Sequence, residues 1–364
     1  NIYNKCKENY VYYYINQHKN NKMNLVGLTN LGNTCYLNTC IQLLKNTHEL
    51  NDILNNKIEF SRYNQNIPDK NVLIEWNKLE MELNDNKNCK KYISPINFVK
   101  CIQDVSKIKN YSLFTGFSQN DMPEFLQLFI ECIHNSLSRP VNMLINGTPL
   151  TYKDVTANKC YLMLKTIYSK EYSEVYDIFN GIYISEIISL NTKQQCSITP
   201  ATFTILDLPI FYENIVATTL YDCFDFFIKP EILNGENAWF NEKTNIKEDI
   251  IKQNSFWNLP KILVITLNRF SIDGTRKINT LINIPIEQLD LSKYISGYDA
   301  NIYKYELFGI CNHMGNVNGG HYNAFVKNRV NQWILYDDTN TTIVDNINSI
   351  ISPSTYCLFY RKKK

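Results

Sequence analysis

The sequence predicts an α+β fold, in which a mostly helical first part is followed by a second part built from strands. From about Cys35 to Leu137 the apolar residues recur at helical spacing. From about Tyr176 to the end of the chain they form short runs that are typical of strands. Because the helices precede the strands instead of alternating with them, we expect the two parts to pack together, with a site where they meet.

Individual elements of both parts can be placed from the same patterns. The apolar residues that share a helical face are Leu37, Cys40, Ile41 and Leu44 in one segment and Phe125, Leu128, Phe129 and Cys132 in another. Four apolar runs in the second part are predicted to be strands, namely residues 203–206, 262–267, 322–326 and 333–336.

Length and composition restrict the class of protein. A chain of 364 residues is expected to form one large domain or two to three merged domains. Apolar residues make up 44% and charged residues 20%, which is typical of a globular protein. The formal net charge of +2 argues against binding to nucleic acid through bulk charge. No apolar run approaches the roughly 18 residues of a membrane-spanning helix.

The cysteines and the first residues bear on the compartment. The 11 cysteines are scattered and never spaced as C-x-x-C, which fits free thiols in a reducing, intracellular compartment. Residues 1–24 are polar and rich in tyrosine, with no apolar stretch to act as a signal peptide. We treat them as an N-terminal extension of unknown role. The first residue is Asn rather than Met, so the chain is a candidate fragment of a longer protein.

Residues 27–38 form a glycine-bearing loop that runs into a predicted helix. Asn33 or Thr34 can cap this helix, which places Cys35 in its first turn. The unpaired N–H groups and the helix dipole there favour a thiolate, the species that attacks a carbonyl carbon. The alternative is that Cys35 is one more small core residue.

A cysteine nucleophile needs a histidine that accepts and later returns its proton. The five histidines are His18, His48, His134, His313 and His321. His321 follows two glycines, Gly319 and Gly320, and leads into a predicted strand, where small residues let a substrate backbone come close. His313 lies nearby and is the rival candidate for the base.

The predicted strands 322–326 and 333–336 are expected to pair as a hairpin. If the hairpin is symmetric about Arg329, His321 lies directly opposite Asp337, with Cβ atoms about 5 Å apart. A carboxylate in that place can hold the imidazole in the correct tautomer. Asp338 then points to the other face, and a register slip of one residue would exchange the two carboxylates.

Three segments resemble the motifs of the ubiquitin-specific protease family. Residues 27–38 (G-L-T-N-L-G-N-T-C-Y-L-N) look like its Cys box, residues 319–326 resemble its G-G-H-Y-x-A-F/Y box, and residues 333–338 resemble its W-x-x-F/Y-D-D pattern. The resemblance implies that the catalytic residues are Cys35 as nucleophile, His321 as base and Asp337 as its partner. It also implies Asn30 as a side-chain donor to the oxyanion, and it leaves His313 as a structural residue at the edge of the site.

Further segments extend the resemblance from about residue 25 to 361. Residues 116–125 resemble the glutamine-aspartate box, with Asn120 where the family prefers Gln, and residues 259–270 and 355–361 resemble its core and closing strands. The resemblance implies that Asp121 contacts the basic tail of ubiquitin. In isolation, a helix N-terminal Asp is the alternative. The other residues expected to bind substrate are Gly320, Tyr322 and Asp338.

The resemblance implies a papain-like fold with a helical thumb at about 25–170, a β-rich palm at about 171–364 and β fingers inserted at about 176–258. It implies a thiol hydrolase that cleaves the isopeptide or peptide bond after the C-terminal glycine of ubiquitin. The alternatives are a protease for another ubiquitin-like modifier and an inactive ubiquitin-binding module. The expected partners are ubiquitin and ubiquitinated proteins, without nucleic acid or membrane. We expect a monomer in the cytoplasm or nucleus.

One property of the family is missing from the sequence. Many members bind zinc at the fingertips through two C-x-x-C pairs, which align here with Ser189 and Thr192 and with Asn241 and Thr244. None of these side chains supplies the thiolate of a structural zinc site. We therefore expect no metal and no cofactor, and we interpret Cys196 and Cys223 as isolated thiols.

Overall fold

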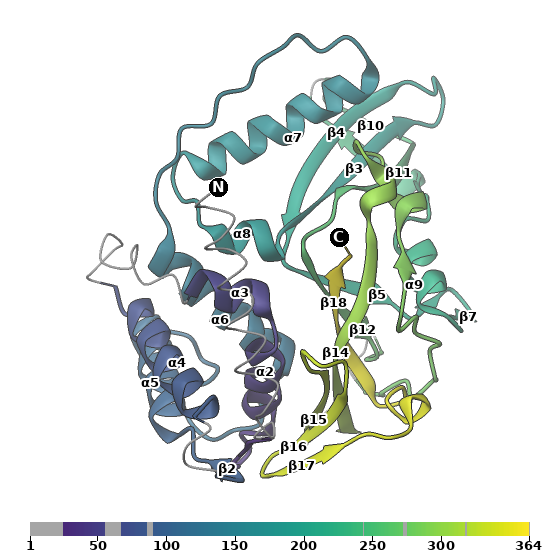
Figure 1. Ribbon diagram of the computed structural model, residues 1–364. Coiled ribbons are helices and arrows are strands. Elements are labelled where there is room, and N and C mark those ends of the chain that lie inside the picture. The colour runs from purple at the N-terminus through teal and green to yellow at the C-terminus, as the bar shows by residue number, and fades with distance from the viewer. Residues whose placement is uncertain are drawn as a thin grey trace, which may run out of the picture.

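Figure 1 shows the computed structural model, which describes residues 25–54, 67–85, 90–242, 244–271, 275–316 and 319–363. The expected N-terminal extension, residues 1–24 with His18, lies outside the described residues. In the view of Figure 1, helices from the first part of the chain pack beside a large sheet, and a smaller sheet with a long helix lies above both. No helix in the described ranges is long and apolar enough to span a membrane.

The first part of the chain is helical. Its elements are β1 (Gly27–Leu28), α2 (Cys35–Lys45), α3 (His48–Leu54), α4 (Asp69–Leu83), β2 (Tyr92–Ile93), α5 (Ile96–Ile108) and α6 (Met122–Leu137), with β1 and β2 paired in parallel. The apolar face of α6 packs against α2 and α4. Residues 35–44 of α2 are all buried, because this helix lies between α6 on one side and strand β15 (Gly319–Lys327) on the other. The first residue of α2 is therefore fixed where the two parts meet.

A smaller sheet follows. Its strands run in the order β4 (Gln195–Phe203), β3 (Gly181–Ser189), β11 (Ile250–Asn258) and β8 (Glu231–Leu233), and a separate hairpin joins β9 (Trp239–Asn241) to β10 (Ile246–Glu248). Helix α7 (Tyr152–Tyr168) begins with a capping box between Thr151 and Asp154 and packs against β4. Ala157, Cys160 and Trp257 are buried between the helix and the sheet. The short helix α8 (Glu174–Phe179) leads into β3.

The large sheet has eight strands among the described residues. The order is β17 (Asn340–Ile343), β16 (Trp333–Asp337), β15, β14 (Lys304–Asn316), β18 (Thr355–Lys362), β12 (Ile262–Asn268) and β5 (Ile205–Pro209), with β13 (Leu289–Asp290) paired to β14. Of these described strands, only β5 and β12 are parallel neighbours. The remaining elements are β6 (Phe211–Tyr212), β7 (Ile215–Val216), α9 (Leu220–Phe227) and the 3₁₀ turns η2 (Gly235–Asn237), η3 (Ser292–Tyr294), η4 (Ala300–Ile302) and η5 (Ile347–Ser349).

The α+β fold is confirmed, and three of the four predicted strands form single strands of the large sheet. The run at residues 203–206 is divided, since Phe203 ends β4 in the smaller sheet and Ile205 begins β5 in the large one. Thr204, between them, donates a hydrogen bond of 3.1 Å to the Asn180 side chain. An apolar run does not reveal such a crossing, because the residues on both sides of it belong to strands.

The register of the β15–β16 hairpin differs from the prediction. Lys327 pairs with Trp333 and Ala324 with Tyr336, which centres the hairpin on Val330 instead of Arg329. In the connecting loop the Asn328 side chain accepts the backbone N–H groups of residues 330 and 332. Asn331 adopts a left-handed φ of 62°, which Asn tolerates better than most residues. The centre lies one residue further along the chain than predicted, so the residue opposite any position of β15 is displaced by two positions.

Candidate active site

Cys35 is the first residue of α2 and lies at the boundary between the helices and the large sheet. Its side chain is 5% exposed. Thr34 occupies the N-cap position, but its hydroxyl accepts the N–H of Leu31 at 2.8 Å instead of capping the helix. The Asn33 side chain donates to the carbonyl of Phe117 at 2.9 Å. The expected side-chain cap is therefore wrong, and the first turn of α2 has no side-chain cap among the described residues.

The environment of the thiol does not favour the thiolate as the sequence predicted. Burial raises the pKa of the Cys35 thiol, and the charge of Asp338 raises it further. Backbone hydrogen bonds from Tyr322, Tyr36 and Cys35 itself lower it, but burial is the larger effect. In the free protein the helix start alone does not stabilise the thiolate, so Cys35 can act as a nucleophile only where a neighbouring base removes its proton.

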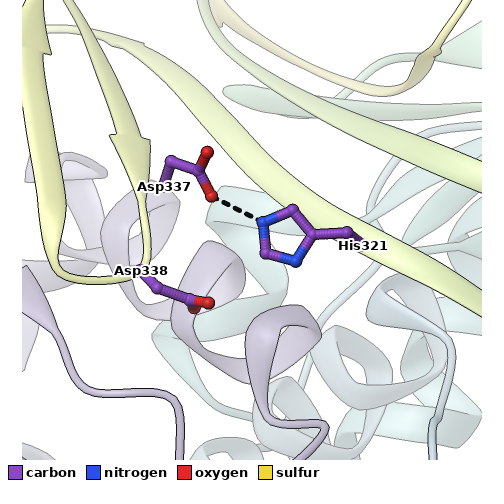
Figure 2. A group of neighbouring side chains, drawn as sticks. All are labelled: His321, Asp337 and Asp338. Atoms are coloured by element: carbon purple, nitrogen blue, oxygen red, sulfur yellow. Dashed lines mark hydrogen bonds and ion pairs between the residues drawn. The ribbon is translucent and has the colours of Figure 1, made fainter.

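His321 and Asp337 form a close pair on neighbouring strands, β15 and β16. Figure 2 shows Nε2 of His321 directed at Oδ1 of Asp337, and the distance between these atoms is 2.5 Å. The other ring nitrogen, Nδ1, lies on the side of the ring away from Asp337. The predicted direct opposition is wrong, because the observed register places Asp337 two positions along from His321. A displacement of two keeps both side chains on one face of the sheet.

Asp338 does not point away from the site, in contrast to the prediction. It lies in the tight turn between β16 and β17 with a φ of 49°, so strand alternation does not apply to it. Its carboxylate accepts hydrogen bonds from the side-chain amides of Asn38 at 2.8 Å and Asn30 at 2.9 Å. Figure 2 shows it on the same side of the hairpin as His321 and Asp337.

Asn30 is fixed at both ends of its amide group. Its Nδ2 donates to Asp338, and its Oδ1 accepts the backbone N–H groups of Gly32 at 3.0 Å and Thr34 at 3.2 Å. Asn30 thus also stabilises the turn that leads into α2. Its Nδ2 also carries a second hydrogen, as every amide does.

His321, Asp337 and Asp338 are the one group in the described ranges with three ligand atoms close enough to hold a metal, all within 4.8 Å of one another. These atoms already have hydrogen-bond partners. Asp337 is bonded to His321, and both oxygens of Asp338 are bonded to asparagine amides. The arrangement is therefore accounted for by hydrogen bonding among the side chains.

A cleft of about 440 Å³ leads to Cys35 between the start of α6 and the ends of β14 and β15. Three of the four residues expected to bind substrate line it, namely Asp121, Gly320 and Tyr322. Asp338 lies instead beside His321. The cleft is bounded by both the helical part and the large sheet, as the order of elements predicted.

Two glycines, Gly319 and Gly320, lie in the wall of this cleft at positions where neighbouring atoms leave no room for a side chain. A Cβ atom at Gly319, whose φ is +150°, would lie 1.8 Å from Oε1 of Gln119. A Cβ atom at Gly320 would lie 2.3 Å from the carbonyl oxygen of Met314. Gln119 also accepts the N–H of Gly320 at 2.9 Å, which connects the residues before α6 to the strand that carries His321. No larger residue fits at either glycine without movement of its neighbours.

Asp121 is engaged by the protein itself. It is the N-cap of α6, where Oδ1 accepts the N–H of Glu124 at 3.3 Å, and its Oδ2 accepts the hydroxyls of Tyr322 at 3.1 Å and Tyr356 at 2.9 Å. Burial raises the pKa of its carboxyl group, although these three hydrogen bonds oppose the rise. The helix-start interpretation from the sequence therefore describes its contacts within the protein. Glu124, exposed in the same cleft, is a second carboxylate that the sequence analysis missed.

His313, the rival candidate for the base, is unsuited to that role. The ammonium of Lys277 lies 3.2 Å from its Nδ1. Burial and this charge lower the pKa of His313 to about 4, so the ring is a poor proton acceptor near neutral pH. Gln119 and Tyr356 lay inside segments that resemble family motifs without being singled out. Lys277 lies outside every such segment, so no pattern in the sequence indicated that it contacts the site.

A buried cysteine at a helix start, bonded to the backbone of the strand that also carries an imidazole–carboxylate pair, is the arrangement of the papain-like class of folds. The family model described as ubiquitin carboxyl-terminal hydrolase matches residues 26–360, and the chain belongs to this family. Human ubiquitin carboxyl-terminal hydrolase 2 is 28% identical over 340 residues, covering 92% of this chain and 55% of the relative. Human ubiquitin carboxyl-terminal hydrolase 21 is 30% identical over 365 residues, covering 92% and 61%. The chain thus spans little more than half the length of these relatives.

Solved structures with the same fold include the SAGA Ubp8/Sgf11/Sus1/Sgf73 DUB module bound to ubiquitin aldehyde. It superposes with a TM-score of 0.70 and 26% identity, covering 94% of this chain and 70% of that one. A mutant form of the same module, bound to monoubiquitin, gives a TM-score of 0.72 at 24% identity, with coverage of 97% and 74%. Both support the expected papain-like α+β fold.

Proposed function

We propose that this chain is a deubiquitinating thiol hydrolase that cleaves the isopeptide or peptide bond after the C-terminal glycine of ubiquitin. The proposal rests on Cys35, which lines the cleft and whose thiol accepts the backbone N–H of Tyr322, the residue that follows His321. His321 is paired with Asp337, and the chain belongs to the ubiquitin carboxyl-terminal hydrolase family. The neighbouring DUB module bound to ubiquitin aldehyde supports ubiquitin as the partner.

The proposed reaction has two halves. His321 takes the proton of Cys35 as the sulfur attacks the carbonyl carbon after the last glycine, and it gives that proton to the leaving amine. The resulting thioester on Cys35 is then hydrolysed by a water molecule that His321 deprotonates. Asp337 keeps a proton on Nε2, so Nδ1 is the basic nitrogen that faces the thiol. Asn30 donates its second amide hydrogen to the oxyanion, together with backbone N–H groups.

We also propose the division into thumb, fingers and palm, with residues 1–24 as an additional segment of unknown role. The thumb comprises about residues 25–170, the fingers about 176–258 and the palm the remainder of about 171–364. Within these ranges α7 packs on the smaller sheet, while β5 belongs to the large one. The fingers would hold the globular body of ubiquitin while its tail occupies the cleft. We propose a monomer that acts inside the cell.

Two other functions remain as alternatives. A protease for another ubiquitin-like modifier would use the same three residues and differ only in its contacts with the tail. An inactive binding module is disfavoured, since Cys35, His321 and Asp337 are all present and His321 is paired with Asp337. No feature of the cleft, as far as the structure describes it, favours a different modifier over ubiquitin.

The proposal can be tested with ubiquitin that carries a C-terminal electrophile, followed by intact-mass measurement. We expect one ubiquitin to be added to the wild type and none to Cys35→Ala. Cys196→Ala is the matched control, because Cys196 is more exposed than Cys35 and lies in the smaller sheet. Labelling that persists in Cys35→Ala would place the nucleophile elsewhere. Preferential labelling by a probe of another modifier would support the first alternative.

A further inference from the structure

His313 lies on β14 within the wall of the cleft and has no role in the proposed proton transfer. Its side chain is only 3% exposed and lines the cleft together with Cys35, Gly320 and Tyr322. The imidazole stacks on the ring of Tyr322, with centroids 4.6 Å apart and planes inclined by 24°. A polar ring is thus buried directly against the residue that follows His321.

Lys277 determines which nitrogen of this ring carries the hydrogen. Its ammonium contacts the carbonyl oxygen of His313 and lies 3.2 Å from Nδ1 of the same residue. An ammonium group can only donate, so Nδ1 must be the acceptor. The hydrogen of the neutral imidazole then lies on Nε2.

Nε2 of His313 has no partner among the described residues of the protein. A Cβ atom at Gly320 would lie 2.6 Å from Nε2, so this nitrogen lies directly beside the glycine. An N–H in the wall of the cleft that has no acceptor in the free protein is available to donate a hydrogen bond to a bound ligand. The glycine leaves the space in which such a ligand can approach.

We propose that His313 is a substrate-binding residue whose Nε2–H donates to a backbone carbonyl of the peptide tail in the cleft, and that Lys277 is the positioning residue that fixes this tautomer. This inference rests on the proposed function, because the tail is that of ubiquitin. His313 contributes to recognition of the main chain, not to proton transfer.

Charge in the cleft favours a neutral acceptor. Asp121 and Glu124 line the same cleft as His313 and disfavour an anionic group of the substrate there. Lys277 is the cation that contacts the ring, and it lies on the Nδ1 side, away from Nε2. A peptide carbonyl satisfies the N–H without bringing a negative charge beside the two carboxylates.

The test compares His313→Phe, which keeps a flat ring without a donor, with His313→Gln, which retains an N–H donor. The substrate is ubiquitin with a fluorogenic C-terminal amide. We expect His313→Phe to raise KM about tenfold with kcat nearly unchanged, since one hydrogen bond formed in both ground and transition states is lost. His313→Gln should recover much of this loss.

Lys277→Met tests the positioning role, because it removes the ammonium and keeps the length of the chain. We expect it to raise KM in the wild-type background and to have no further effect in His313→Phe, since Lys277 acts through His313. Additive effects of the two substitutions would show that Lys277 acts independently. If His313→Phe fails to fold, His313→Gln and Lys277→Met still give the KM comparison.

Two outcomes separate this inference from the proposed function. If the wild type cleaves the ubiquitin amide and His313→Phe has the same KM, or loses kcat alone, the inference is overturned and the function stands. If the wild type does not cleave it and Cys35→Ala does not bind ubiquitin in a titration, the proposed function fails and the inference fails with it.

Discussion

His321 and Asp337 are diagonal neighbours across the β15–β16 hairpin, and their side chains still meet, with Nε2 and Oδ1 2.5 Å apart. Diagonal pairs in antiparallel strands are about 7–8 Å apart at their backbones, a distance that long or aromatic side chains span. The imidazole side chain of His321 is long enough to span this distance. The pair therefore tolerates a register displaced by two residues, whereas a displacement of one would turn Asp337 to the other face.

The first prediction concerns the two neighbouring carboxylates. Asp337→Ala should lower kcat/KM at least about tenfold, because the imidazole loses its orienting partner. Asp338→Ala should cost a similar amount, within about tenfold of Asp337→Ala, because Asn30 loses the acceptor that directs it. Steady-state kinetics on a ubiquitin amide measure both values.

A matched control for these variants is Asp345→Ala, an exposed carboxylate on the segment that follows β17. It should leave kcat/KM unchanged. Asn30→Ala combined with Asp338→Ala should lose little more than either change alone, since both act through one amide. If only Asp337→Ala lowers kcat/KM, Asp338 has the minor role in catalysis that was expected for a residue on the opposite face of the strand.

Cys35, His321 and Asp337 were proposed from the resemblance to family motifs, because the helix start, the glycine pair and the strand period left alternatives open. The hairpin geometry that also pointed to Asp337 assumed a register that the structure does not have. Asp338 was misplaced because its φ of 49° belongs to a turn, and no period describes a turn. The hairpin centre was misplaced because the Asn328 side chain closes a loop of a length that the pattern of apolar residues does not encode.

The second prediction concerns Asp121. From the sequence, Asp121→Ala is expected to raise KM with kcat nearly kept, because contact with a basic tail is uniform binding. The structure adds a cost of about 1–2 kcal/mol in the free energy of unfolding, because α6 loses its N-cap and two tyrosine hydroxyls lose their acceptor.

Urea denaturation and KM should be measured on the same preparations of this variant. Asp121→Asn is the matched control, because it keeps an acceptor and a capping group but removes the charge. It should retain most of the stability while still raising KM. An unchanged KM with a collapsed kcat would contradict the tail-binding assignment of Asp121.

The third prediction concerns the tip of the smaller sheet. The side chains of Asn241 and Thr244 both donate to Glu248, at 2.7 Å and 3.2 Å, and the N–H of Thr192 donates to the hydroxyl of Ser189 at 3.2 Å. Hydrogen bonds thus occupy the positions that the resemblance to the family aligned with zinc ligands. We expect a strong chelator to change neither the melting temperature nor kcat/KM. About one zinc per chain after dialysis would contradict this.

Glu248→Ala tests whether that hydrogen-bonded tip matters for stability. The Asn241 and Thr244 side chains would lose a shared acceptor, so we expect a small loss in the free energy of unfolding, about 1 kcal/mol, because the site is partly exposed. Glu236→Ala, an exposed acid in the neighbouring η2 turn, is the matched control. Equal stability of the two variants would show that the tip does not depend on these bonds.

The last prediction concerns stability at low pH. Burial and the Lys277 charge lower the pKa of His313 from its ordinary value of 6.5 to about 4. Between these two values the unfolded chain binds a proton at this position and the folded chain does not, so acid favours unfolding. This loss in the free energy of unfolding is absent above about pH 6.5, grows as the pH falls and stops growing below about pH 4. It corresponds to roughly 3 kcal/mol at most.

Removal of this titrating group should make the stability less dependent on pH. We expect the free energy of unfolding of His313→Gln, measured in urea, to fall less steeply between pH 6.5 and 4 than that of the wild type. His48→Gln is the matched control, because burial and the charges of Arg329 and Arg361 lower the pKa of His48 to about 4 as well. His48 lies on α3, outside the cleft, so the two variants should flatten the curve independently, and neither should raise KM as much as His313→Phe. Parallel curves for His313→Gln and the wild type would show that His313 is protonated equally in both states, and that Lys277 does not hold its ring neutral.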